Sequence, residues 1–112
     1  MRLWIDDERP MPKTFTHRTE SSWESIALLT IELESGRTVE LISFDHDLGW
    51  LPGAAGEDDT SRPVLLWILE TGFWPREVRF HTANQDGHEW LTDLAVRWAP
   101  PETVVDVTDI WA

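Results

Sequence analysis

The sequence contains two short apolar runs that both stop abruptly in carboxylates, Leu3-Trp4-Ile5-Asp6-Asp7 and Leu41-Ile42-Ser43-Phe44-Asp45-His46-Asp47. An apolar run of this length is typical of a strand buried on both faces of a parallel sheet. If the two strands lie side by side, four carboxylates and one imidazole meet at their carboxyl ends. Carboxylates that close repel one another, so a divalent cation or raised pKa values are needed to hold them together. The two runs therefore predict a parallel sheet with a site at its edge, where a divalent cation or raised pKa values hold the carboxylates together.

The composition is that of an ordinary globular domain. The chain has 112 residues, 41% of them hydrophobic, and we expect a single domain, 1–112. No stretch approaches the roughly 18 apolar residues of a membrane span. Cysteine is absent, which excludes disulfides and zinc–thiolate sites and favours a reducing cytoplasm. Because the N-terminus leads directly into the first strand-like run, no signal peptide is expected.

The formal net charge of -12 narrows the choice of partners. It argues against binding of a DNA duplex, which needs clustered lysine and arginine. Small phosphorylated ligands remain compatible, because a bound metal ion inverts the local field. Outside the two acidic clusters, the simpler interpretation is that the charge keeps a tryptophan-rich surface in solution.

Strand-like and helix-like segments alternate along the chain. We expect strands at 1–5, 39–44, 77–80 and 103–107, with a further short strand within 13–18. Helices are expected at 21–35, from 60 or 61 to 71, and at 87–98. Pro10 and Pro12 prevent a full helix after the first strand, so the first helix should be short or missing. This alternation predicts an α/β fold, with helices on both faces of a mostly parallel five-stranded sheet.

Local signals refine the helices and one loop. Ser21 and Glu24 form a capping box that opens helix 21–35. Residues 49–59 contain three glycines and one proline and are expected to form a flexible lid, in which Trp50 could stack on a base or sugar. The inward faces of the first and last helices are expected to carry Trp23, Ile26, Ala27, Thr30 and Leu33, and Trp90, Leu91, Leu94 and Trp98, respectively.

The acidic clusters lie where an open α/β sheet binds its ligands, beyond the carboxyl ends of strands at the point where strand order reverses. Asp6 and Asp7 are candidate ligands of a hard cation, the alternative being a turn capped by aspartate. Asp45 and Asp47 share one face of an extended chain, and His46 lies on the other. The alternative for this second cluster is an ordinary polar turn after a strand.

A third polar cluster, His81-Thr82-Ala83-Asn84, follows the strand expected at 77–80. Histidine titrates near neutrality, so His46 and His81 could act as general acid and base if they face one another across the pocket. A histidine after a strand is also commonly a structural hydrogen-bonding group. Whether His81 takes part in acid–base catalysis therefore depends on its position relative to His46.

These motifs carry a family resemblance. Residues 3–10, 43–49, and 81–84 with Gly87 resemble the cyclic-phosphate-processing receiver domain family, small bacterial and phage proteins related to the receiver domains of two-component signalling. The resemblance implies a flavodoxin-like three-layer sandwich and action on cyclic phosphates. Asp6 and Asp7 are similar to the acidic pair that binds Mg²⁺ in receivers. Asp45 falls at the phosphoacceptor position, with Asp47 as an alternative.

One departure from receivers shifts the expected function. A receiver has a lysine at the end of its last strand, but residues 104–109 contain none. We therefore expect a metal-dependent phosphoesterase acting on a cyclic phosphate, either a cyclic nucleotide or a cyclic-phosphate end. The alternatives are a non-catalytic module that binds a nucleotide or partner protein, and a phosphoacceptor receiver.

The expected site combines residues from all three clusters. Mg²⁺ or Mn²⁺ would be held by Asp6, Asp7 and Asp45, with Asp47 nearby. The expected catalytic residues are His46, His81 and Asp45. A small phosphorylated ligand, nucleotide-derived, would be bound by Arg9, Thr82 and Asn84. The oligomeric state is left open.

Overall fold

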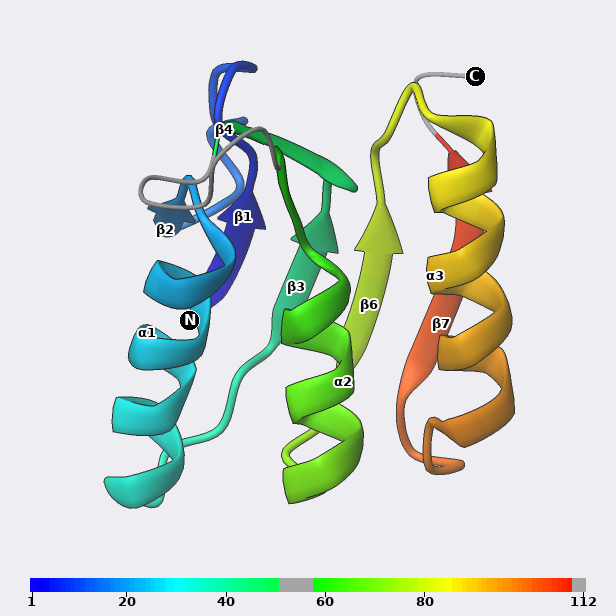
Figure 1. Ribbon diagram of the computed structural model, residues 1–112. Helices are drawn as coiled ribbons and strands as arrows, with labels where there is room; N and C mark the ends of the chain where they lie inside the picture. The colour runs from blue at the N-terminus through cyan, green and yellow to red at the C-terminus, as the bar shows by residue number, and fades with distance from the viewer. Residues whose placement is uncertain (51–57, 110–112) are drawn as a thin grey trace.

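The computed structural model describes residues 1–50 and 58–109. Five parallel strands form one sheet in the order β2-β1-β3-β6-β7. These strands are β1 (Arg2–Ile5), β2 (His17–Thr19), β3 (Leu41–Phe44), β6 (Glu77–Phe80) and β7 (Val104–Asp109). The helices are α1 (Ser22–Glu34), α2 (Arg62–Thr71) and α3 (Gln85–Trp98). The α/β class, the parallel five-stranded sheet and the flavodoxin-like strand order are confirmed (Figure 1).

The two apolar runs lie side by side, as the sequence predicts. β1 sits between β2 and β3, and Ile5 is in register with Phe44. The chain therefore leaves β1 toward one edge of the sheet and returns toward the other, which makes the end of β1 the point of reversal. The backbone N–H of Asp45 donates to the carbonyl of Ile5 at 3.0 Å. This bond extends the hydrogen-bond ladder between β1 and β3 as far as Asp45.

All three helices cover the same face of the sheet (Figure 1). The second helical layer of the expected sandwich is not found in the described residues. No helix forms between β1 and β2, as expected, because two prolines interrupt that segment. On the helix-free face, the strand side chains Trp4 and Leu41 instead pack against Phe15, with Met11 alongside. The main core lies between sheet and helices and includes Leu3, Ile5, Ile42, Phe44, Val78, Phe80, Leu65, Ile68 and Leu91.

The inward face predicted for α1 is wrong at several positions. Trp23 is 62% exposed, and Ala27 and Leu33 are also exposed. Ser22, Ser25 and Leu29 are buried instead. Two buried polar contacts set this rotation: Ser22 binds Asp59, and the hydroxyl of Ser25 lies 2.6 Å from that of Thr19. In α3, likewise, Trp98 is 58% exposed, whereas Leu91 and Ala95 are buried.

A short antiparallel hairpin, absent from the sequence expectations, follows β3. Its strands are β4 (Asp47–Trp50) and β5 (Asp58–Thr60). The predicted lid lies mostly in residues 51–57, outside the described residues, so its expected role is not tested. The buried carboxylate of Asp59 accepts hydrogen bonds from Ser22, at 2.6 Å from the backbone nitrogen and 2.7 Å from the hydroxyl. This contact fixes the base of the hairpin to the N-terminus of α1.

Among the described residues, no helix is both long and apolar enough to cross a membrane.

Candidate functional site

Three carboxylates meet at the carboxyl edge of the sheet. Asp6 and Asp7 follow β1, and Asp45 follows β3. One oxygen from each lies within 4.8 Å of the other two, so this group could hold a metal ion. Asp6 is fully buried, Asp45 is 9% exposed and Asp7 is half-buried. The expected cluster therefore forms at the reversal point of the sheet.

Asp6 is held in place by contacts to both of its oxygens. Its Oδ1 accepts hydrogen bonds from the backbone nitrogens of Glu8 at 2.8 Å and Arg9 at 3.0 Å. Its Oδ2 lies 3.1 Å from Nε2 of His81. These contacts turn the chain sharply after β1 and fix the orientation of the carboxylate before any ligand arrives.

The electrostatics of the cluster favour a cation. The pKa of the Asp45 carboxyl is raised from 3.8 to about 7, mainly by burial and then by repulsion from Asp6. The neighbouring Arg9 and a hydrogen bond with Thr82 act in the opposite direction. Burial also raises the pKa of Asp7. A divalent cation would offset the repulsion between these carboxylates, and oxygen donors are the ligands that hard cations such as Mg²⁺ and Mn²⁺ prefer.

The β4–β5 hairpin packs closely against one of these carboxylates. Gly49, in β4, has φ +75°, and a Cβ atom there would lie 2.6 Å from Oδ2 of Asp7. Glycine is therefore required at this position for two reasons. It adopts the left-handed backbone conformation without strain, and it allows the close approach of Asp7.

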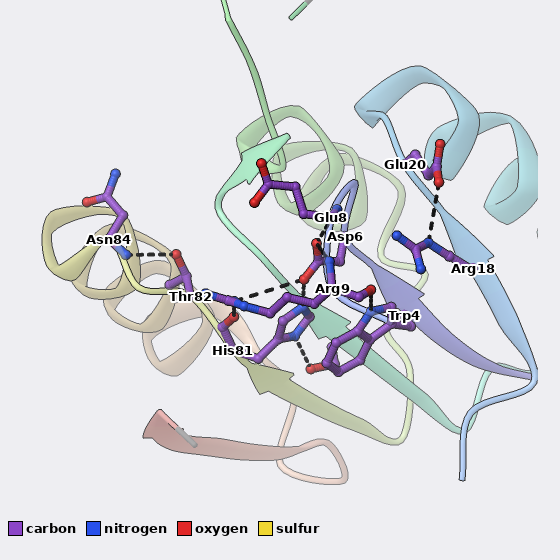
Figure 2. Close-up of polar contacts among 10 residues, drawn as sticks. Trp4, Asp6, Glu8, Arg9, Arg18, Glu20, His81, Thr82 and Asn84 are labelled. Atoms are coloured by element: carbon purple, nitrogen blue, oxygen red, sulfur yellow. Dashed lines mark hydrogen bonds and ion pairs between the residues drawn. The ribbon is translucent and has the colours of Figure 1, made fainter. Parts of the chain in front are cut away.

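Arg9 and Thr82 flank the carboxylates. Nη1 of Arg9 donates to the carbonyl of His81 at 2.6 Å and lies 4.0 Å from Oδ2 of Asp6 (Figure 2). The hydroxyl of Thr82 accepts from the backbone nitrogen of Asn84 at 3.1 Å. A guanidinium and a hydroxyl beside a cation site are suitable groups for a phosphate, and these are two of the three residues expected to bind it.

His81 is enclosed behind the carboxylates. It is 0% exposed, and its ring stacks on Trp4 with centroids 3.6 Å apart and planes 7° apart. Nδ1 lies 2.7 Å from Oγ of Ser43, and Nε2 lies against Asp6. Burial lowers the pKa of this imidazole to about 4, so the ring is neutral at pH 7. Both nitrogens are engaged within the protein.

His46 belongs to a separate network. Its Nδ1 lies 2.7 Å from Oδ1 of Asp47, and its Nε2 accepts from Nε of Arg62 at 2.8 Å. The Arg62 guanidinium also lies over the ring of Trp90, 4.6 Å from its centroid. Asn84 donates to both oxygens of Asp47, at 3.2 and 3.3 Å. The two histidines therefore share no partner, and Asp47 faces this network, outside the three-carboxylate cluster.

Gly87 lies close to this network. It is the third residue of α3, and a Cβ atom there would overlap the imidazole of His46. Asn84 caps the same helix, because its Oδ1 accepts from the backbone nitrogen of Gly87 at 2.9 Å. The helix therefore begins earlier than the sequence suggested, and Asn84 serves both the helix and the network.

Sequence reasoning missed three residues of the site. Ser43 and Trp4 were counted with the apolar strands, although both contact His81. Arg62 was predicted only as a helix residue, and its contact with His46 was missed. A signal existed for Ser43, which is the single polar residue in the run 41–44.

Comparison with known proteins agrees with this geometry. Residues 1–97 match the model of the cyclic-phosphate processing receiver domain family. The chain belongs to this family. The family resemblance inferred from the three motifs is therefore confirmed. No curated protein and no solved structure matches the chain.

Proposed function

We propose that this receiver domain is a metal-dependent phosphoesterase that hydrolyses a cyclic phosphate, with a nucleotide or a nucleotide-derived end as substrate. The observation that carries the proposal is the cluster of Asp6, Asp7 and Asp45, whose oxygens lie within 4.8 Å of one another. A Mg²⁺ or Mn²⁺ ion bound there would supply Lewis-acid stabilisation of the phosphoryl oxygens. Family membership supports the class of substrate.

Arg9 is proposed to bind the phosphate. Its guanidinium lies beside Asp6 and lowers the pKa of Asp45, so it reaches the same end of the sheet as the carboxylates. A receiver takes a cation from a lysine of its last strand, which this chain lacks. Arg9 supplies positive charge from the segment after β1, and a guanidinium can bind two phosphate oxygens at once. Thr82 and Asn84 would position the same group from the α3 side.

His46 is proposed as the general acid–base group. In the neutral ring only one nitrogen carries hydrogen, and Arg62 donates to Nε2, so Nδ1–H donates to Asp47. A carboxylate on Nδ1 orients the imidazole and leaves Nε2 as the basic atom, the arrangement used by hydrolytic triads. Hydrolysis would require Arg62 to release Nε2, which could then take a proton from water and return it to the leaving oxygen. The contacts of His81 favour support of Asp6 over proton transfer.

Turnover of cyclic nucleotides with Mn²⁺, followed by ³¹P NMR of the product, tests the proposal. The parent should convert 2′,3′- or 3′,5′-cyclic nucleotides to phosphomonoesters. His46→Ala should lower turnover by about 10²–10⁴-fold while Mn²⁺ still binds. Asp45→Asn should lose both turnover and Mn²⁺ binding. His17→Ala, at an exposed histidine on β2, is the matched control and should behave as the parent.

Two other results would replace the proposal. Saturable binding of a cyclic nucleotide without product would indicate a binding module. Stable beryllofluoride occupancy that requires Asp45, without hydrolysis of any cyclic phosphate, would indicate a phosphoacceptor. Unchanged turnover in His46→Ala would remove the acid–base assignment alone.

A further inference from the structure

Ser43, His81 and Asp6 form a hydrogen-bonded chain from the helix-free face of the sheet to the carboxylate cluster. Oγ of Ser43 lies 2.7 Å from Nδ1 of His81, and Nε2 of His81 lies 3.1 Å from Oδ2 of Asp6. The three residues are 2%, 0% and 0% exposed. They follow or belong to three adjacent strands, β3, β6 and β1. The chain is thus built from the sheet itself.

The direction of each bond follows from the acceptors available. Oδ1 of Asp6 accepts two backbone N–H groups, so this side chain already acts as a hydrogen-bond acceptor. Its Oδ2 is the acceptor that faces His81, so we assign Nε2 of His81 as the donor. An imidazole with one N–H donates from one nitrogen and accepts at the other, so with Nε2 as donor Nδ1 accepts from the hydroxyl of Ser43. The contacts therefore select one tautomer of His81.

Packing fixes the ring in the plane that these bonds require. The imidazole lies parallel to Trp4 at 3.6 Å, and Trp4 is itself 1% exposed. Trp4 contacts Phe15 edge to face, with centroids 5.1 Å apart. A ring held by stacking and by both nitrogens cannot turn without breaking two buried hydrogen bonds.

We propose that Ser43 and His81 are positioning residues for the metal ligand Asp6: Ser43 anchors His81 so that Nε2–H holds the Asp6 carboxylate toward the cation. This inference rests on the proposed function for the presence of the cation. Groups that orient a ligand in this way commonly change metal affinity by about 10–100-fold when they are replaced. His81 acts through Asp6 and does not touch the substrate.

Two replacements of His81 separate its two contacts. The amide nitrogen of Gln lies near the place of Nε2 and keeps a donor for Asp6, whereas the shorter Asn reaches only toward Ser43. Isothermal titration of the full chain with Mn²⁺ should show His81→Gln within about threefold of the parent. His81→Asn should bind at least about 10-fold more weakly. Equal affinity of the two variants, each folded by circular dichroism, would overturn the role of Nε2.

Ser43 offers a matched pair of its own. Ser43→Ala removes the hydroxyl and should weaken Mn²⁺ binding by about 10-fold. Ser43→Thr keeps the hydroxyl, and the cavity of about 220 Å³ that Ser43 lines has room for the added methyl group, so affinity should stay near that of the parent. Parent affinity in Ser43→Ala would overturn the role of Ser43.

The tautomer of His81 tests the arrangement without any metal. Long-range ¹H–¹⁵N correlation spectra of the metal-free parent should show the Nε2–H form, with an Nδ1 shift that changes in Ser43→Ala. An Nδ1–H tautomer would overturn the proposal whatever the metal result. Absence of Mn²⁺ binding in a parent that shows the Nε2–H form would instead overturn the metal site of the proposed function, so the two failures are distinguishable.

Discussion

His81 and His46 both follow the carboxyl end of a buried strand, yet their surroundings differ in what they allow each ring to do. His81 is stacked on Trp4 and bonded at both nitrogens to buried groups that lead to the carboxylates. His46 is bonded to Asp47, an exposed carboxylate, and to an arginine side chain. The partners of the first ring are buried, whereas the carboxylate that binds the second is exposed to solvent. Position after a strand therefore does not determine whether a histidine supports a site or reacts in it.

The largest effect that would sharpen this comparison is expected on the His46 side. Gly87→Ala places a methyl group where the His46 imidazole lies, so the ring must shift. Displacement of a catalytic group by about 1 Å can cost about 10²-fold in rate, and we expect a loss of that order in turnover of a cyclic nucleotide. Mn²⁺ affinity, measured by isothermal titration, should stay close to that of the parent.

A double-mutant cycle supplies the control for this effect. In a His46→Ala background the ring is absent, so Gly87→Ala should cause little further loss of turnover. If the two losses instead multiply, Gly87 acts through another route and the assignment of His46 is weakened.

A smaller effect, on metal affinity, is expected on the carboxylate side. Gly49→Ala brings Cβ to 2.6 Å from Oδ2 of Asp7 and should displace this carboxylate, weakening the proposed Mn²⁺ binding by about 10-fold. Gly36→Ala is the matched control, because Gly36 has φ +70° but nothing within 4 Å of an added Cβ. Both substitutions should cost about 1–2 kcal/mol in stability from the backbone alone. Equal Mn²⁺ affinity in the two variants would contradict a metal-binding role for Asp7.

The smallest expected effect is on the pH dependence of stability in the metal-free protein. The pKa of Asp45 is raised from 3.8 to about 7, so the folded state binds a proton more tightly than the unfolded chain. The resulting stabilisation is present below pH 3.8 and is lost as the pH rises to about 7. His81, whose pKa falls from 6.5 to about 4, acts in the opposite direction between those values.

Because His81 acts in the opposite direction, the contribution of Asp45 to the pH dependence of stability is measured as the difference between the parent and Asp45→Asn. Between pH 5 and pH 8, Tm of the parent should fall relative to Tm of Asp45→Asn by several degrees, as measured by thermal unfolding. Saturating Mn²⁺ should remove the difference in slope if the ion binds Asp45. Parallel Tm profiles without metal would show that Asp45 ionises normally.

The sequence predicted the sheet more accurately than it predicted the helices. The range of β6 and the pairing of β1 with β3 were both predicted, because short apolar runs that end in polar residues leave few alternatives. The rotation of α1 was missed because contacts with distant residues determine it: Asp59 lies 37 positions from Ser22. Hydrophobic periodicity contains no information on such a contact.

In the site, too, features that follow from the strand ends were predicted, and features that depend on distant contacts were not. The three carboxylates were predicted because the ends of parallel strands meet at one edge. The separation of His46 from His81 could not be predicted, since it depends on Ser43, Trp4 and Arg62. Each of these residues has an ordinary role in its own strand or helix, and only the folded arrangement shows its second contact.

The position of β1 between β2 and β3 has a consequence for biosynthesis. Asp6 is made 75 residues before His81 and gains its contact with that residue only once His81 has been added. At about 5–20 residues per second, this interval lasts roughly 4–15 s. During translation β1 and the carboxylates that follow it therefore lack their final contacts for this interval. We expect ribosome-bound chains that stop before β6 to lack the carboxylate cluster in its final geometry.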